Sequence, residues 1–97
     1  MMYNIYFGTI ATGAKYQFTK NVKTEEEAKE LAKSGASSLY YRNEGKHGIP
    51  SFKQISEESQ ITGLPIKDLY NEHIVDMMRW YAIPTDVDTI PNKKLKY

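Results

Sequence analysis

Apolar and polar residues alternate over the first twenty residues of the chain. The alternating apolar positions are Tyr3, Ile5 and Phe7 in one segment and Ala14, Tyr16 and Phe18 in the next. A period of two is typical of strands with one buried face, and Gly13 between the segments can adopt the positive φ that a short hairpin loop requires. We therefore predict an antiparallel β-hairpin whose apolar face needs a cover, because two strands alone are marginally stable in water.

The next segment, "TEEEAKELAKSGASSLYY", has the pattern of an amphipathic helix. Thr24 and Glu27 are spaced as a capping box at its start. A narrow stripe of small apolar residues follows at helical spacing: Ala28, Leu31, Ala32, Gly35 and Leu39. Gly35 costs about 1 kcal/mol relative to alanine inside a helix, so it either permits close packing or ends the helix early. We expect this helix to cover the hairpin.

The second half of the chain predicts two more helices. The stretch "RNEGKHGIP" breaks the pattern with two glycines and a proline, and Ser51 with Gln54 forms a second capping box. A short helix is predicted from 52 to about 59 and a longer one from about 63 to 82.

Prolines at 84 and 91 prevent the last helix from continuing, and "TDVDTIPNKKLKY" predicts an extended C-terminal tail or one more short strand. The expected order is β-β-α-α-α followed by this tail. That order defines an α+β fold, and the length suggests a single domain of residues 1–97.

Residues 55–69 resemble the general helix-turn-helix pattern. Its apolar, small and capping positions are matched by Ile55, Ser59, Ile61, Thr62, Ile66 and Leu69. Thr62 would be the N-cap of the second helix, and Gln60 replaces the glycine common in the turn. The other interpretation is an ordinary helical hairpin whose apolar positions pack into the core.

The residues that would face DNA are poorly suited to it. Bases are contacted near the start of the second helix, where residues 63–65 are glycine, leucine and proline and Lys67 is the one suitable contact. Glu57, Glu58 and Asp68 would repel phosphate. Lys93, Lys94 and Lys96 in the tail are the remaining candidate nucleic-acid contacts. We do not expect sequence-specific DNA binding, and a nucleic-acid-binding regulator is kept as the alternative.

Composition narrows the chemistry further. The chain has 13 basic and 12 acidic residues, a net charge of +1, and no cysteine, so a strongly basic footprint and thiolate chemistry are both missing. No nucleophile or phosphate-loop motif is present. Glu72, His73 and Asp76 are close in sequence, but they fit a solvated helix face better than a metal site. We predict no enzyme, metal or cofactor, with a dispersed catalytic or ligand site as a second alternative.

The stretch "MMRWYAIP" favours an interface. Met77, Met78, Arg79, Trp80 and Tyr81 are of the residue types that dominate binding energy at protein contacts. On a helix, successive residues turn by about 100°, so one core contact would not bury them all. The alternative is burial on all sides by the hairpin and the tail.

These features together predict a small non-enzymatic protein that binds a protein partner or a second copy of itself. Small cysteine-free domains without catalytic motifs are common among phage and mobile-element products, so a regulator or inhibitor from such an element is one expectation. No apolar run reaches the roughly 20 residues that span a bilayer, and no basic leader precedes the first apolar segment. We therefore expect a cytoplasmic protein with no membrane association.

Overall fold

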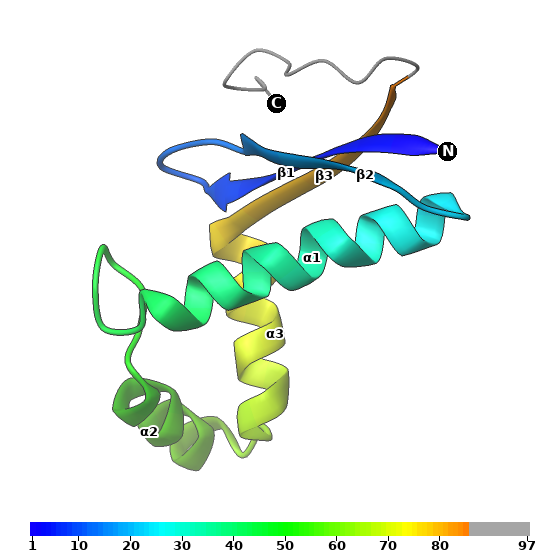
Figure 1. The fold of residues 1–97 in the computed structure, drawn as a ribbon. Helices are drawn as coiled ribbons and strands as arrows, with labels where there is room; N and C mark the ends of the chain where they lie inside the picture. Colours follow the sequence, from blue (N-terminus) through cyan, green and yellow to red (C-terminus); the bar gives the residue numbers. More distant parts are fainter. Residues whose placement is uncertain (86–97) are drawn as a thin grey trace.

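Three antiparallel strands and three helices form the computed structural model, which describes residues 1–85 (Figure 1). The elements in chain order are β1 (Met2–Thr9), β2 (Lys15–Asn21), α1 (Glu25–Arg42), α2 (Phe52–Thr62), α3 (Ile66–Met77) and β3 (Met78–Thr85). The fold is α+β, and the predicted hairpin, covering helix and helix pair are confirmed. The predicted C-terminal tail from residue 86 lies outside the described residues.

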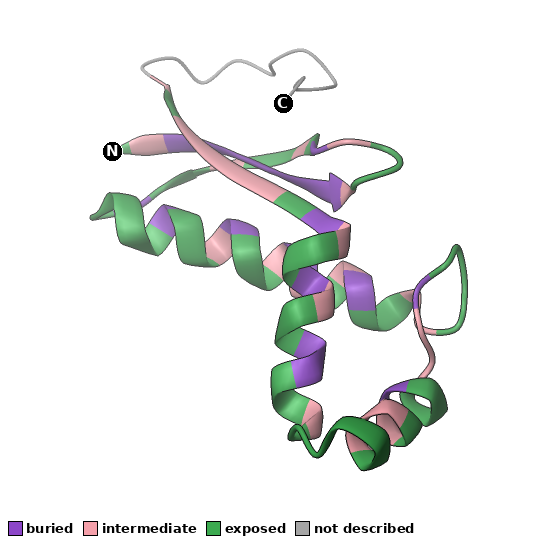
Figure 2. Ribbon diagram, turned by 180° about the vertical axis from the view of Figure 1, so that it is seen from behind, coloured by how far each residue is buried: buried purple, intermediate pink, exposed green. Residues whose placement is uncertain are grey.

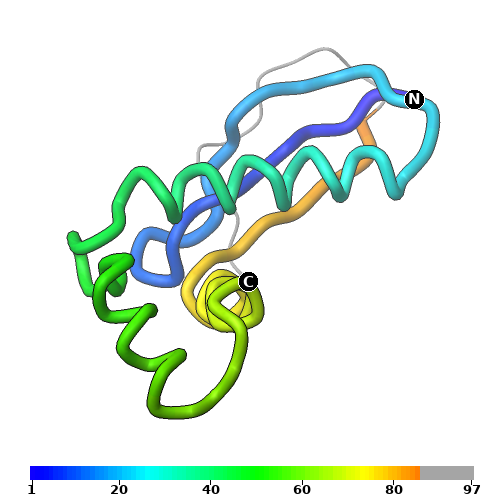
Figure 3. The backbone as a smooth tube through the Cα atoms, turned by 90° about the horizontal axis from the view of Figure 1, so that it is seen from below, coloured from blue at the N-terminus to red at the C-terminus, as the bar shows by residue number. Residues whose placement is uncertain are grey.

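The central strand of the sheet is β1, which pairs with β2 on one side and with β3 on the other. Gly13 in the β1–β2 turn has the expected positive φ, 74°. Ile5 lies opposite Phe18 in β2 and opposite Ala82 in β3. Directly opposed residues point to the same face. Helix α1 covers the face with Ile5, because Ile5 belongs to the same buried cluster as the alanines of α1. Figure 3 shows α1 running along the strands beneath this face.

An irregularity in β2 corrects the prediction that Tyr16 and Phe18 share a face. The register shifts beside Ile5, so that Tyr16 lies opposite Tyr6 and Gln17 is the extra residue of a bulge. The Gln17 side-chain amide donates to the backbone carbonyl of Phe7 at 3.2 Å. The Tyr6 and Tyr16 rings then meet edge to face, with centroids 5.9 Å apart, on the face turned away from α1. Simple alternation could not reveal the inserted residue.

Helix α1 begins at the predicted cap. The Thr24 hydroxyl accepts a hydrogen bond from the Glu27 backbone N–H at 3.2 Å. The Glu27 carboxylate accepts from the N–H of Lys23, also at 3.2 Å, rather than from that of Thr24. The fully buried positions of the helix recur every fourth residue: Ala28, Ala32, Ala36 and Tyr40. Leu31 and Leu39, expected in this stripe, lie beside it and are half-buried.

Close packing explains Gly35. A Cβ at this position would overlap the Phe7 ring, so the glycine lets the ring lie directly against the backbone of α1. Gly35 does not end the helix, which continues to Arg42. Of the two interpretations of Gly35, the structure therefore supports close packing.

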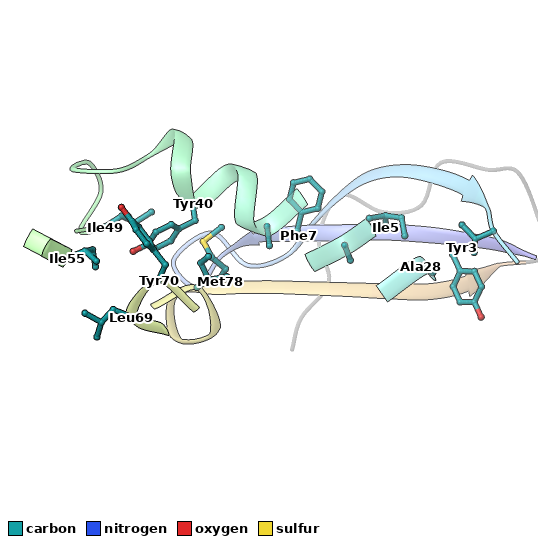
Figure 4. Close-up of a cluster of buried hydrophobic side chains, with 14 residues drawn as sticks. Tyr3, Ile5, Phe7, Ala28, Tyr40, Ile49, Ile55, Leu69, Tyr70 and Met78 are labelled. Atoms are coloured by element: carbon teal, nitrogen blue, oxygen red, sulfur yellow. The ribbon is translucent and has the colours of Figure 1, made fainter. Parts of the chain in front are cut away.

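The core extends from the sheet into the helices (Figures 2 and 4). Tyr3, Ile5 and Phe7 lie between the sheet and α1, and Ile55 and Tyr70 lie at the far end among the helices. Figure 2 shows that α2 is exposed along most of its length. Its one buried residue is Ile55. The helix is thus attached to the core at a single point.

The start of α2 is confirmed, and its end lies beyond the predicted one. Ser51 and Gln54 form the complete capping box, with the Ser51 N–H donating to the Gln54 side chain at 2.8 Å and the Ser51 hydroxyl accepting from the Gln54 N–H at 3.3 Å. The helix ends at Thr62, and Gly63 follows with a φ of 77° in the left-handed region. This is the common glycine stop at a helix C-terminus.

The predicted helix from about 63 to 82 is wrong after Met77. Helix α3 ends at Met77, and β3 begins at the next residue. The segment "MRWYAI" is rich in residues that favour strands, and it pairs with β1 along its whole length. Its partner lies almost at the other end of the chain, which local spacing cannot show.

We predict that Gly35→Ala destabilises the protein. Alanine favours the helix by about 1 kcal/mol relative to glycine. This gain is outweighed by overpacking against Phe7, which typically costs about 1–3 kcal/mol. Chemical denaturation of the variant measures the difference. Ser34→Ala, at an exposed position of the same helix, is the control and should not destabilise. A Gly35→Ala protein more stable than the parent would contradict the contact, and Phe7→Leu should partly rescue the alanine variant.

Candidate functional site

The residues predicted as an interface, 77–81, do not form one patch. Met78 is buried at 1% exposure, Met77, Trp80 and Tyr81 are half-buried, and Arg79 is exposed. Successive strand residues point to opposite faces. Trp80 therefore points to the α1 face, opposite Phe7, and Tyr81 to the other face, opposite Tyr6. The helical geometry behind the prediction is wrong.

Arg79 has a local structural contact. Its guanidinium donates to the backbone carbonyls of Met78 at 2.8 Å and Val75 at 3.2 Å. The carbonyls in the last turn of a helix have no partner within the helix, and basic side chains commonly satisfy them. Arg79 thus stabilises the direct passage from α3 into β3.

A cavity of about 470 Å³ lies between the β1–β2 turn and the loop that follows α1. Its apolar wall residues include Phe7, Ile10, Leu39, Ile49 and Met77, and its polar ones Thr12, Lys15, Gln17, Asn43 and His47. Met77 is the one predicted interface residue that it includes. Sequence reasoning missed this site because its residues are spread from the first strand to the end of α3, with no local motif.

Both walls of the cavity are held by hydrogen bonds. In the turn, the Thr9 and Thr12 hydroxyls lie 3.1 Å apart, and the Thr12 N–H donates to the Thr9 hydroxyl at 3.1 Å. The N–H of Ile10 donates to the carbonyl of Met77 at 2.9 Å, which ties the turn to the end of α3. Across the cavity, the Asn43 amide donates to the carbonyl of Leu39 at 2.8 Å.

Helices α2 and α3 project from the sheet as an arm (Figure 1). Ile55 of α2 belongs to the same buried cluster as Leu69 and Tyr70 of α3. The His73 ring lies 3.2 Å from the Glu58 carboxylate, joining the two helices a second time. His73 is therefore a half-buried residue with a partner across the helix pair.

The structure does not have the predicted helix-turn-helix spacing. Thr62 belongs to α2, where its hydroxyl donates to the carbonyl of Glu58 at 2.9 Å, and it is not the N-cap of the next helix. Pro65 precedes α3 in that position. Ile61, expected to pack inward, is 85% exposed. The helix pair is real, but its turn is displaced along the sequence.

The outward side of α3 is acidic. Asp68, Glu72 and Asp76 recur every fourth residue and are all exposed, so they form a carboxylate stripe along the helix. Lys67 is exposed beside it, and the candidate contacts Lys93, Lys94 and Lys96 lie outside the described residues. Within residues 1–85, no group of three His, Cys, Asp or Glu side chains is placed to hold a metal ion. In the same range, no helix is long and apolar enough to span a membrane.

The end of the arm, residues 61–65, carries exposed apolar side chains on an ordered turn. We call these residues the arm tip. Ile61 is 85% exposed and Leu64 is 41% exposed. The Ser59 hydroxyl donates to the carbonyl of Leu64 at 2.6 Å, and the N–H of Gly63 donates to the carbonyl of Ser59 at 2.9 Å. The sequence shows this feature only as an uncharged stretch, "SQITGLPI".

Three tyrosines join the arm to α1. The Tyr70 ring lies 6.1 Å from that of Tyr40 and 5.1 Å from that of Tyr41, centroid to centroid. The Tyr40 hydroxyl is buried without a hydrogen-bond partner among the described residues, and burial raises the pKa of Tyr40 to about 12. Burial also raises the pKa of Tyr70, assisted by its hydrogen bond to the Glu44 carboxylate. Tyr40 and Tyr70 are therefore packing residues whose neutral forms the fold favours.

No family model, curated protein or solved structure matches this chain. Its function is therefore inferred from the surfaces described above: the arm tip, the cavity and the carboxylate stripe.

We predict that Tyr40→Phe raises the free energy of unfolding by about 1 kcal/mol, because it removes a buried hydroxyl that has no partner. The folded-state pKa lies above the ordinary value near 10. The contribution of neutral Tyr40 is therefore complete below about pH 10 and is lost as the pH rises towards about 12.

Denaturation curves between neutral and alkaline pH measure both effects. The phenylalanine variant should lose less stability on alkalinisation than the parent. Tyr41→Phe is the control, because the Tyr41 side chain is 48% exposed. Loss of stability in Tyr40→Phe at neutral pH would mean that the hydroxyl has a stabilising role.

Proposed function

We propose that the protein is a non-enzymatic binding protein that uses the arm tip to occupy an apolar surface on a partner protein or on a second copy. The observation that carries this proposal is the exposure of Ile61, in the last turn of α2, and of Leu64, in the hydrogen-bonded turn that follows. A protein that regulates or inhibits by occupying a surface needs no catalytic groups.

The order of the turn supports the proposal. An apolar residue in a loose loop has no defined direction, and binding would have to order it at a cost in entropy. Here the Leu64 carbonyl and the Gly63 N–H are both engaged, and the Leu64 N–H donates to the Thr62 hydroxyl at 3.3 Å. The backbone that carries Leu64 is thus held by hydrogen bonds, and Ile61 is held in the last turn of α2.

The free energy gained by burying these two side chains is sufficient for a contact site. Burying one large aliphatic side chain contributes about 1.5–3 kcal/mol, and about 1.4 kcal/mol corresponds to a tenfold change in affinity. Residues 77–81 offer less, since Met78 is buried and Trp80 packs partly against the core. The proposed contact site therefore moves from that segment to the arm tip.

The attachment of α2 is consistent with a binding role. A helix that contributes one buried residue, Ile55, adds little to the core, and a helix of 11 residues is marginal by itself in water. Its capping box stabilises the helix itself, and Ile55 and the His73–Glu58 contact hold it in place. Its position makes it a projecting support for the arm tip.

The nucleic-acid alternative is disfavoured by the carboxylate stripe on α3. A recognition helix lies in a groove between two rows of phosphates, and Asp68, Glu72 and Asp76 would face them. We predict that duplex DNA gives no mobility shift that survives physiological salt and excess competitor, and that Lys67→Ala changes nothing. A competitor-resistant shift that is lost in Lys67→Ala would instead support a DNA-binding arm.

The variant Ile61→Lys tests the proposed contact. We expect at least a tenfold loss of affinity for the partner, or of self-association, because a lysine cannot be buried without a counter-charge. Sedimentation velocity over a concentration series measures self-association, and affinity capture from a host extract compares bound proteins between parent and variant.

The matched control is Val75→Lys, another exposed apolar residue near the end of a helix, 57% exposed in the parent. Both variants should keep their stability within about 0.5 kcal/mol of the parent, as surface substitutions usually do. If Ile61→Lys and Val75→Lys retain every interaction of the parent equally, the arm tip is not the contact site.

A further inference from the structure

We propose that the cavity between the β1–β2 turn and the loop after α1 binds a small organic anion with an apolar body. This site is separate from the arm tip and does not depend on its function. Its size, its lining and the placement of Lys15 and His47 support the assignment.

The size and the apolar lining of the cavity indicate a small ligand with an apolar body. A volume of about 470 Å³ falls within the range of about 300–1,000 Å³ typical of small-molecule sites. Phe7, Leu39, Ile49 and Met77 contribute apolar walls. Such a lining favours an alkyl chain or a ring over a fully hydrated ion, because an apolar wall cannot replace the water around a small ion.

The charged residues that line the cavity favour a negatively charged ligand. Lys15 and His47 both line the cavity, and the described lining residues include no aspartate or glutamate. Within residues 1–85, the ion pairs join Lys29 to Glu25 and His73 to Glu58, so Lys15 is not neutralised there by a carboxylate. A lysine ammonium binds carboxylate and phosphate oxygens through short, charge-assisted hydrogen bonds. An anionic head group therefore fits the Lys15 side of the cavity.

The backbone at His47 gives independent support. Its φ of 52° is the one positive value at a non-glycine residue in the described chain. Hydrogen bonds from Gly45 N–H to the Ile49 carbonyl and from Ile49 N–H to the Lys46 carbonyl, both 2.9 Å, hold the loop in this shape. Gly45 and Gly48 show that this loop uses glycine at its other positive-φ positions. An imidazole is thus kept at the cavity in a backbone conformation that favours glycine.

The test uses octanoate as the probe and octanol as its uncharged match. Titration of the ¹⁵N-labelled full chain, followed by two-dimensional NMR, measures both dissociation constants. We expect octanoate to shift the amide signals of Leu39, Asn43 and His47 saturably and to bind about tenfold more tightly than octanol, as one charge-assisted hydrogen bond would give.

Lys15→Met should weaken octanoate about tenfold and leave octanol unchanged. Lys20→Met is the matched control, since Lys20 is also an exposed lysine of β2 but does not line the cavity. Ala11→Trp, at an exposed position on the rim, should obstruct the cavity and weaken both probes. Because Lys15 and Ala11 are exposed, we expect both variants to fold like the parent, so that their binding can be compared with it.

Four results would overturn the proposal. The first is no saturable binding of octanoate in the millimolar range. The second is equal affinity for octanoate and octanol in both the parent and Lys15→Met, which would show a purely apolar cavity. The third is a set of shifted signals centred on the arm tip rather than on the cavity. The fourth is self-association that prevents octanoate from shifting the cavity signals, which would show that this wall contacts a second copy of the protein.

Discussion

The close approach of α1 to β1 is the contact on which the rest of the structure depends. A stripe of alanines and Gly35 removes side-chain bulk from one side of the helix, so that the Phe7 ring lies against its backbone. The alanines contribute little burial area individually, but they allow one helix to cover the central strand. This covering buries the face of the sheet that a hairpin alone would leave in water.

The position of α1 also places the two surfaces to which we assign binding. Its C-terminal turn brings Leu39 and Asn43 opposite the β1–β2 turn, which creates the cavity. Tyr40, the last fully buried residue of α1, contacts the Tyr70 ring of α3 and thereby sets where the arm leaves the body. A shift of α1 relative to the sheet would alter both surfaces together.

Local patterns predicted the elements that depend on neighbouring residues. The alternation around Ile5, the caps at Thr24 and Ser51, and the break after α1 all reflect interactions within a few positions, and the structure confirms them. The strand β3 could not be predicted in this way. "MRWYAI" directly follows a helical pattern, so spacing alone extended the helix through it, and pairing with β1, far away in sequence, makes it a strand. The cavity was missed for the same reason. The arm tip left a local trace in "ITGLP", where Ile61 was assigned to an apolar position of the helix pair and residues 63–65 were interpreted only as a poor DNA contact.

The pairing of β3 with β1 has a consequence for how the chain folds. Met2 lies opposite Thr85, so completing the sheet closes a loop that contains almost all of the described residues. Non-local pairing of this kind slows folding, because the entropy of closing the loop is lost before the contacts form. The hairpin and α1 can assemble earlier from local contacts, and in that intermediate the second edge of β1 is open, with Tyr3, Ile5 and Phe7 only partly covered. Open edges with apolar side chains pair readily with other chains. Refolding yield should therefore fall with protein concentration, even if the native protein is monomeric.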